Sequence, residues 1–240
     1  NAALKLQGKE PLILTRDTSY IGTLIDDLVT KGTEEPYRIM TSRSEYRLLH
    51  RQDNADKRLT HIGYRLGLVS RERMEAVEEK YAAVEREIAR LESSGVPASE
   101  ELNAMLAAKD TAPVANSARL ADLLRRPQVS YADIAPFDAT RQPLPEAVKQ
   151  EVQIQLKYAG YLARQEKQVE AFRKEESRRL PEHIDYMAIS GLRVEAREKL
   201  QAIRPVSIGQ ASRISGVAPA DISVLMVWEL SQKEECTDEN

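Results

Sequence analysis

The sequence predicts a mainly α-helical protein, and three observations support this fold class. Apolar residues recur at steps of three and four over most of the chain, which is the period of a helix buried on one side. Ser, Asp, Gly and Pro stand at the ends of these periodic segments, where helices begin and stop. No segment after residue 70 alternates convincingly as a strand does. We therefore expect an all-α helical-bundle domain over residues 70–240, preceded by a different domain over residues 1–68.

The composition limits what this protein can be. Its 240 residues are 42% hydrophobic and 30% charged, which suits packed helices with exposed polar faces. The net charge of −3 means that any contact with nucleic acid needs a local basic patch. No run of 18 apolar residues occurs that would cross a membrane. Cys236 is the only cysteine and the three histidines lack ligand spacing, so neither a disulfide framework nor a metal site is expected.

The first domain begins with what reads as the end of a helix that stops at Gly8, which suggests a chain that starts inside a larger protein. Residues 11–16 are expected to be a short strand or an extended segment. In the helix that follows, apolar residues at i, i+3, i+4, i+7 and i+8 predict the buried face: Ile21, Leu24, Ile25, Leu28 and Val29. Asp26 and Asp27 point away from that face. Adjacent side chains on a helix diverge by about 100°, so a structural role is favoured over an acid–base pair.

The first domain is expected to end with a short helix that stops at Gly67, and the helical domain to begin with a long helix that has a coiled-coil-like seam. The seam consists of Met74, Val77, Tyr81, Val84, Ile88 and Leu91. A weaker helix is expected at 100–108, a flexible loop at 109–116 and a helix at 117–126. Ser130 and Asp133 predict a start like a capping box.

The longest helix is expected after Pro145, and it runs to about Arg179. Its apolar stripe consists of Val152, Leu156, Ala159, Leu162, Val169 and Phe172. Gly160 lies inside this helix and costs about 1 kcal/mol relative to Ala. That cost suggests close packing of another backbone at this glycine.

Residues 208–230 look like a helix-turn-helix, with a turn at Gly216 and a second helix from about Pro219. DNA-binding versions place the second helix in the major groove. Here no Lys or Arg occurs between Arg213 and Lys233, whereas base and phosphate contacts need cationic donors. We therefore reject DNA reading and expect a packing or protein-contact unit. Its predicted buried stripe is Ile222, Leu225, Met226 and Leu230, with Val224, Val227 and Trp228 broadening the apolar face.

A basic segment is the clearest functional feature. Arg43, Arg47 and Arg51 recur every four residues, so on a helix they would form one stripe with steps of about 6 Å. That spacing suits a row of phosphate oxygens. The alternative is a solvated helix face that neighbouring acidic residues neutralise.

Several long motifs resemble one family. The block YIGTLIDDLVTKGTEEPYRIMTSRSEYRLLHRQDNADKRLTHIGYRLGLV closely resembles the hallmark of the flavin-binding large subunit of the GidA/MnmG family, which modifies the tRNA wobble uridine. LADLLRRPQVSYADI, KYAGYLARQ, IDYMAISGLRVEAREKL and PVSIGQASRISGVAPADISVLMV match it in the same order. The resemblance covers nearly all of the chain.

The resemblance implies a parent enzyme that uses FAD, NADH and methylene-tetrahydrofolate. With a GTPase of the MnmE type, it would add an aminomethyl or carboxymethylaminomethyl group to C5 of uridine 34. Residues 1–68 would then be the end of an α/β FAD domain, and residues 70–240 would bind the GTPase and tRNA. The parent is expected to be a cytoplasmic homodimer without membrane or DNA contacts. G-x-G-x-x-G and the family cysteines are missing from this sequence, so no catalytic or cofactor-binding residue is assigned.

The residues expected to bind tRNA are Arg38, Arg43, Arg47, Arg51, Lys57 and Arg58, a basic concentration set among tyrosines that can stack on unpaired bases. Those expected to bind the partner protein are Tyr158, Tyr161, Arg164, Arg213, Met226 and Trp228. The alternative function is a structural or protein-interaction module without RNA contact.

Overall fold

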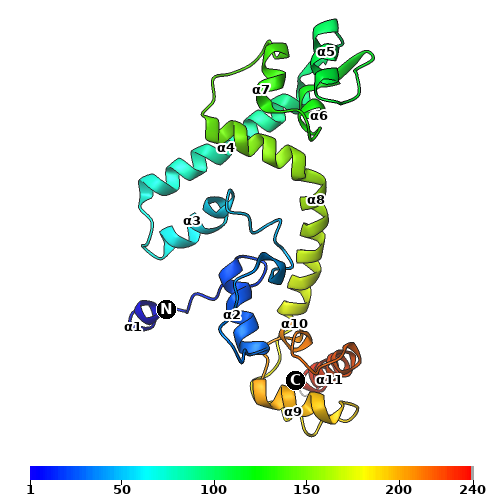
Figure 1. Ribbon diagram of the computed structural model, residues 1–240. Coiled ribbons are helices and arrows are strands. Elements are labelled where there is room, and N and C mark those ends of the chain that lie inside the picture. Colours follow the sequence, from blue (N-terminus) through cyan, green and yellow to red (C-terminus); the bar gives the residue numbers. More distant parts are fainter. Residues whose placement is uncertain (239–240) are drawn as a thin grey trace. The chain divides into compact units, whose positions relative to one another are not determined.

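The computed structural model describes the backbone of residues 1–238 and the side chains of residues 1–231, and it confirms the mainly α-helical fold (Figure 1). The chain forms two compact units. Unit 1 combines residues 1–50 with the chain from 165 onwards, and unit 2 spans residues 51–164. The proposed domain boundary between residues 68 and 70 stays a prediction. The side chain of Cys236 lies outside the described residues.

Unit 2 is built from helices and one small sheet. Its elements are α3 (Ala55–Arg65), α4 (Arg71–Ser93), β1 (Gly95–Pro97), α5 (Glu100–Ala108), β2 (Ser117–Arg119), α6 (Leu120–Leu124), α7 (Tyr131–Ile134), the 3-10 helix η2 (Ala135–Phe137) and the first part of α8 (Glu146–Ser177). Ser130 and Asp133 form the expected capping box at the start of α7. Gly67 ends the turn after α3 with φ +75°, a conformation that favours glycine.

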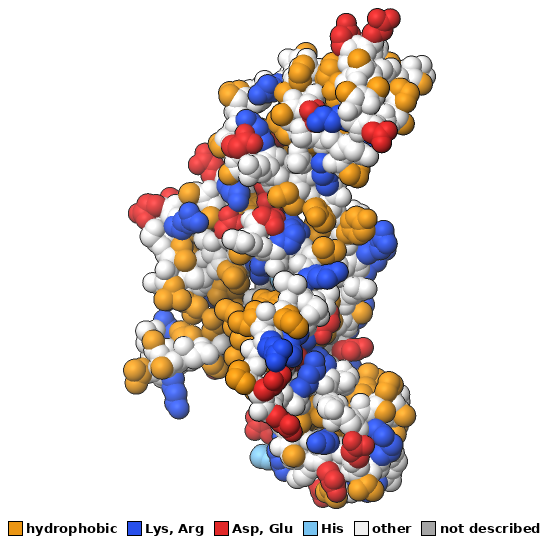
Figure 2. All heavy atoms as spheres, viewed as in Figure 1, with side chains coloured by type: hydrophobic (Ala, Val, Ile, Leu, Met, Phe, Trp, Pro, Cys, Tyr) orange, Lys and Arg blue, Asp and Glu red, His pale blue; other side chains and the backbone are white. Residues whose placement is uncertain are grey.

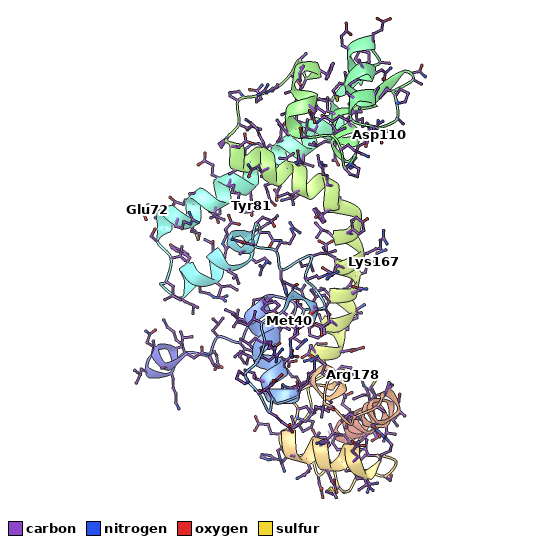
Figure 3. The ribbon with its side chains drawn as sticks, viewed as in Figure 1. Met40, Glu72, Tyr81, Asp110, Lys167 and Arg178 are labelled. Carbon is purple, nitrogen blue, oxygen red and sulfur yellow. The ribbon has the colours of Figure 1, made fainter. Side chains whose placement is uncertain are left out.

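The predicted seam of α4 forms much of the core of unit 2. Val84 and Leu91 are fully buried, and Val77 and Tyr81 nearly so. The hydroxyl of Tyr81, labelled in Figure 3, donates a 2.6 Å hydrogen bond to Asp56 of α3. Leu102 and Leu106 of α5 also lie in this core, together with residues of α6, α7 and α8. The predicted seam of α4 and the predicted stripe of α8 therefore both contribute buried residues to this core.

Two expectations for unit 2, the lack of strands and the start of a helix at residue 117, are wrong. Strands β1 and β2 pair antiparallel, with Val96 opposite Ala118, so residues 117–119 are extended and the helix begins only at Leu120. Three-residue strands are too short to show alternation, which is why the pattern missed them. The loop at 109–116, for which flexibility stays a prediction, is anchored at Val114. Asn103 exchanges two side-chain hydrogen bonds with the backbone of Val114, and Val114 is buried in the core.

Unit 1 brings together the two ends of the chain. Its elements are α1 (Ala2–Leu6), α2 (Tyr20–Thr30), the 3-10 helix η1 (Thr41–Arg43), the second part of α8, α9 (Val194–Ile203), α10 (Ile208–Ser212) and α11 (Pro219–Asp238). Residues 11–15 belong to no helix or strand, and Arg16 lies in a turn. The apolar core of unit 1 lies among α9, α10, α11 and the segment before α9.

The predicted buried face of α2 is wrong, because this helix is turned the other way. Ile21, Ile25 and Val29 are more than half exposed, at 56%, 52% and 56%. Thr23 and Asp27 of the opposite face are buried instead. Figure 2 shows hydrophobic side chains gathered at the place where Figure 1 draws α2. The polar face is buried because it binds an inward-pointing arginine, described below.

The helix-turn-helix is present as α10, a turn at Gly216 and α11. Ile222 and Leu225 are buried as expected, but Leu230 is 53% exposed. Glu229 takes the buried position beside it and forms a 2.5 Å ion pair with Arg178. Asp221, in the first turn of α11, is also buried and is held by Arg193 at 2.6 Å. These two buried acidic residues of α11 therefore stabilise the fold.

Two further expectations for α8 are wrong. A Cβ atom added at Gly160 would meet nothing within 4 Å, so no backbone packs closely on this glycine among the described residues. Ala159 is exposed, although Val152, Leu156 and Val169 are buried as predicted. Over the described part of the chain, no helix combines the length and apolar character needed to span a bilayer, and no cluster of His, Cys, Asp or Glu could hold a metal.

Candidate functional site

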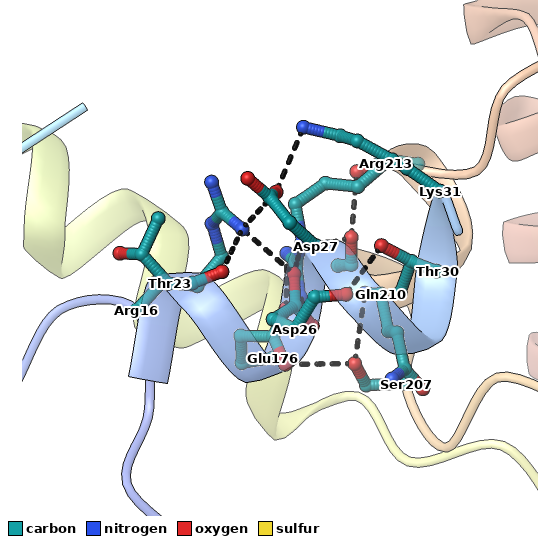
Figure 4. A network of polar contacts seen from close by, with 12 residues as sticks. Arg16, Thr23, Asp26, Asp27, Thr30, Lys31, Glu176, Ser207, Gln210 and Arg213 are labelled. Atoms are coloured by element: carbon teal, nitrogen blue, oxygen red, sulfur yellow. Dashed lines mark hydrogen bonds and ion pairs between the residues drawn. The ribbon is translucent and has the colours of Figure 1, made fainter. Parts of the chain in front are cut away.

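A buried arginine organises the N-terminal half of unit 1. The guanidinium of Arg16 is 2% exposed and lies 3.0 Å from Asp26, 2.7 Å from Asp27 and 2.6 Å from Glu45 (Figure 4). Burial opposes its charge, but hydrogen bonds with Glu45 and Asp27 raise the pKa of Arg16 above its ordinary value. The guanidinium of Arg16 therefore stays positively charged although it is buried against α2.

The same network joins α2 to the C-terminal helices of unit 1. Asp26 accepts a 2.8 Å hydrogen bond from Nε of Arg213, and Arg213 also contacts Glu176 at 2.6 Å. Glu176 in turn accepts a hydrogen bond from Ser207 at the start of α10. Arg213, which was expected on the partner-binding surface, is thus only 14% exposed and is engaged inside unit 1.

Asp27 carries a second set of contacts within this network. It accepts hydrogen bonds from Arg16, from Lys31 at 2.9 Å and from the Tyr37 hydroxyl at 2.7 Å. Burial opposes its charge, but these donors keep the pKa of Asp27 below its ordinary value. Burial and the nearby carboxylate raise the pKa of Tyr37 to about 12. Both aspartates are bound by cations, which favours the structural role expected for them.

Sequence reasoning missed Arg16, Glu45 and Glu176 as members of this network. A usable signal was present, because Arg16 ends an apolar extended segment just before a helix that carries two adjacent aspartates. A cation that becomes buried needs an acidic partner, and Asp26 and Asp27 are acidic residues of the next helix that point off its apolar face.

Three of the basic residues expected to bind tRNA lie in unit 1 and face solvent. Arg38, Arg43 and Arg47 are all exposed. Arg38 makes only a 3.4 Å contact with Glu35, and Arg43 lies over the Tyr37 ring at 4.4 Å. The side chain of Arg47 forms no ion pair with a described residue. The helical stripe proposed for Arg43, Arg47 and Arg51 is wrong, because η1 ends at Arg43 and residues 45–49 form turns.

The other three lie in unit 2 and are more engaged. Arg51 is 14% exposed and binds Asp53 at 3.0 Å. Arg58 donates hydrogen bonds to Asn54 and to the carbonyl of Arg51. Burial, and then the charge of Arg51, lowers the pKa of Arg58. Lys57 is exposed and lies 5.0 Å from the ring of Tyr81. Arg51 and Arg58 therefore support the fold of unit 2, whatever else they bind.

Four residues form an aromatic–guanidinium ladder in unit 2, which we define as Arg51, Tyr158, Tyr161 and Arg164. The guanidinium of Arg51 lies 5.5 Å from the centre of the Tyr158 ring. The rings of Tyr158 and Tyr161 are 6.4 Å apart, and Arg164 lies 5.5 Å from the Tyr161 ring. The structure thus brings a residue expected to bind tRNA next to three that were expected to bind a protein.

The remaining predicted partner residues, Met226 and Trp228, lie on α11 in unit 1. Both are partly buried and pack against the apolar core. Trp228 also lines a pocket of about 630 Å³, whose other lining residues are Asp185, Ala188, Ile189, Ser190, Ser223, Val224, Val227 and Ser231. Val227 at its edge is 68% exposed. This pocket offers a mostly apolar surface on unit 1.

Comparisons with known proteins agree with the motifs. Residues 71–166 match the model of the tRNA modifying enzyme MnmG/GidA C-terminal helical domain, and residues 168–239 match the model of its C-terminal helical bundle. Crystal forms II and I of Aquifex aeolicus GidA superpose with TM-scores of 0.80 and 0.77 at 43% identity. Each match covers 95% of this chain, and 36% and 35% of the respective structure.

Three curated relatives share the name tRNA uridine 5-carboxymethylaminomethyl modification enzyme MnmG. Those of Caldicellulosiruptor saccharolyticus and Lachnoclostridium phytofermentans are 54% identical over 228 residues, and that of Enterococcus faecalis is 52% identical over 229. Each match covers 95% of this chain but only 36% of the relative. The chain therefore belongs to the MnmG/GidA family and carries the family's C-terminal helical domains.

Proposed function

We propose that this chain is the tRNA-binding and partner-binding part of an enzyme that modifies the wobble uridine of tRNA. The observation that carries the proposal is that Arg38, Arg43 and Arg47 are exposed within one short segment of a chain whose net charge is negative. Relatives more than half identical are named as tRNA uridine modification enzymes. The reaction of the parent would add a carboxymethylaminomethyl or aminomethyl group at C5 of the uridine.

The exposed arginines are suited to phosphate binding. Arg47 is not neutralised by a described carboxylate, and the contact of Arg38 with Glu35 joins two side chains that are each 69% exposed. Such exposed pairs contribute little, so phosphates can compete for the guanidinium. Arg43 lies over the Tyr37 ring, which restricts its motion. Binding of this kind releases counterions and weakens as salt rises.

A second surface is proposed for a GTPase of the MnmE type. The pocket beside Trp228 is mostly apolar, and the exposed Val227 and Leu230 of α11 extend the apolar surface near it. Aromatic side chains in such pockets often anchor a partner protein. We place the partner here rather than at Arg213, because Arg213 is held by Asp26 and Glu176.

The chemistry itself is assigned to other parts of the parent. FAD and NADH would supply electrons in the parent enzyme, which we expect to be a cytoplasmic homodimer. The sequence of this chain contains no G-x-G-x-x-G turn, so no residue here is assigned to FAD or NADH. We therefore derive no step through either cofactor here.

A protein-interaction module without RNA contact is the second candidate function. The internal contacts of Arg51 and Arg58 favour it, because they show that part of the basic set stabilises unit 2. In this case, the exposed arginines would not contribute to RNA affinity.

A tRNA-binding titration separates the two functions. Replacing Arg38, Arg43 and Arg47 together by Ala should weaken tRNA binding by roughly tenfold or more at low salt and should flatten its salt dependence. A matched variant replaces Arg71, Arg73 and Arg86, three exposed arginines of α4, by Ala. Equal affinities for the two triple variants and the unchanged protein would reject the basic segment as a tRNA surface.

The partner surface is tested separately with Trp228→Asp. This variant should no longer retain an MnmE-type GTPase in a pull-down, while its tRNA affinity stays unchanged. Circular dichroism checks its folding. If the variant is folded and still retains the GTPase, the pocket is not the docking surface.

A further inference from the structure

The two tyrosines of the ladder, Tyr158 and Tyr161, are exposed and do not belong to the core of unit 2. Tyr158 is 39% exposed and Tyr161 57%, whereas Leu156 and Val152 of the same helix are buried. Tyr158, Tyr161 and Arg164 follow at steps of three, so they lie along one face of α8. Apart from these tyrosines, the exposed large apolar side chains among the described residues of unit 2 are Tyr64 and Leu68. Both rings of the ladder therefore remain partly open to solvent.

The two arginines of the ladder have different surroundings. Arg51 is bound by Asp53, so its charge is compensated and its role is to hold the Tyr158 ring. Arg164 is exposed and forms no ion pair with a described carboxylate. Its guanidinium lies over Tyr161 and keeps its donors available to an anion. One end of the ladder is therefore fixed to the fold, and the other end offers a free positive charge.

Gly160 provides an independent observation. It lies four residues before Arg164, and thus next to it on the helix surface. A glycine here costs about 1 kcal/mol relative to Ala, and no contact within the described chain accounts for that cost. A side chain added at this position would meet only open space. The helix backbone is therefore accessible to a ligand beside the ladder.

We propose that the ladder is a stacking site for unpaired bases of a single-stranded RNA segment. Bases would stack on the Tyr158 and Tyr161 rings, Arg164 would bind the adjoining phosphate, and Gly160 would let the backbone of the RNA approach the helix. Aromatic rings paired with guanidinium groups suit unpaired bases, because every base offers a π face. This proposal rests on the proposed function, because it names a contact for the RNA substrate. It assigns to RNA binding three residues, Tyr158, Tyr161 and Arg164, that were expected from the sequence to bind the partner protein.

The test uses the 240-residue chain and a labelled oligouridylate of about ten nucleotides, with binding followed by fluorescence anisotropy. Tyr158→Ala and Tyr161→Ala should each lower the affinity roughly tenfold, while Tyr158→Phe and Tyr161→Phe should retain it. The matched control is Tyr64→Ala, because Tyr64 is 40% exposed and lies outside the ladder. A duplex RNA of the same length should bind no differently to these variants, since its bases are already stacked.

Salt dependence separates stacking from charge. The alanine variants of the tyrosines should leave the slope of affinity against salt unchanged, whereas Arg164→Ala should reduce it by about 0.7, the value for one phosphate on a single strand. Gly160→Ala should stabilise the chain and yet weaken binding. A variant that binds less well because it is unfolded cannot give this pair of results.

The proposal is overturned if the unchanged chain does not bind the oligouridylate, or if both tyrosine-to-alanine variants bind it as well as Tyr64→Ala does. It is also overturned if these variants lose an MnmE-type GTPase in a pull-down and keep their RNA affinity, which would make the ladder a protein surface. The proposed function is judged by tRNA binding and the triple arginine variant instead. If the ladder proposal is overturned but the triple arginine variant loses tRNA affinity, the proposed function stands. If the ladder binds oligouridylate but the chain does not bind tRNA, only the proposed function is rejected.

Discussion

Nε of Arg213 lies 2.8 Å from Oδ2 of Asp26, although 187 positions separate the two residues along the chain. Both side chains are 14% exposed, and each has a second ionic partner, Glu176 for Arg213 and Arg16 for Asp26. Because Arg16 lies in the N-terminal segment and Glu176 at the end of α8, the network joins the two parts of unit 1.

Removing one member of this pair should destabilise unit 1. We expect Arg213→Met to lower the free energy of unfolding by about 2–3 kcal/mol, because it leaves the carboxylates of Asp26 and Glu176 partly buried and less well paired. Urea unfolding measures the change. Arg71→Ala is the control, since Arg71 and Glu75 form an exposed pair that should contribute less than about 1 kcal/mol. Equal losses for the two variants would contradict a special role of the buried pair.

Stability should fall at acidic pH because of Asp27. Its pKa in the folded chain lies below the ordinary value of 3.8, so it binds protons less readily when folded than when unfolded. Its contribution is therefore complete above pH about 4 and is lost as the pH falls through the folded pKa. Urea unfolding between pH 7 and 3 should show this loss. The Asp27→Asn variant should be less stable at pH 7, and its free energy of unfolding should fall less steeply toward pH 3 than that of the unchanged chain. If the two free energies fall in parallel, Asp27 is not the source of the loss.

Two glycines within helices should respond oppositely to alanine. A Cβ at Gly22 would lie 2.1 Å from the backbone oxygen of Thr15, so Gly22→Ala should cost roughly 2 kcal/mol or more. Gly160→Ala meets nothing within 4 Å and should raise the free energy of unfolding by about 1 kcal/mol. Thermal unfolding of both variants provides the measurement. A stabilising effect at Gly22 would show that α2 does not approach the extended segment before it so closely.

The orientation of α2 leads to a further prediction. Ile25→Gln should change the free energy of unfolding by less than about 0.5 kcal/mol, because Ile25 is 52% exposed in this chain. A core position gives the contrast, since Leu106→Ala should cost about 2–5 kcal/mol. Chemical unfolding compares the two directly. If Ile25→Gln approached the cost of the core variant, the apolar face of α2 would be buried after all.

The contribution of one buried hydroxyl to the stability of unit 2 can be tested by removing its oxygen atom. The Tyr131 hydroxyl donates a 2.6 Å hydrogen bond to Glu87, which is buried and is also held by Arg90 at 2.7 Å. Tyr131→Phe should cost about 1–3 kcal/mol, because the buried carboxylate loses a donor. Tyr64→Phe serves as the control at an exposed site. Tyr131→Phe should lower the free energy of unfolding more than Tyr64→Phe does. Equal changes for the two variants would show that the hydrogen bond contributes nothing measurable.

The sequence alone determined most of the helices, the seam of α4, the capping box at Ser130 and the stop at Gly67. These signals act between residues no more than four positions apart, so they can be read locally. Its motifs also identified the family, which the comparisons confirmed. The position of Asp26 and Asp27 off the apolar face followed from the helical period as well.

The tertiary structure decided which face of α2 is buried, that β1 pairs with β2, and that Arg51 reaches the Tyr158 ring. Each of these depends on a partner outside the element itself. Arg16, from the segment before α2, and Arg213, from the other end of the chain, supply the charge that makes the polar face of α2 the buried one. Periodicity shows where a stripe lies on a helix, but not which side finds its neighbours. A carboxylate bound to a buried cation can outweigh an apolar stripe that has no partner, and that balance exists only once distant segments have met.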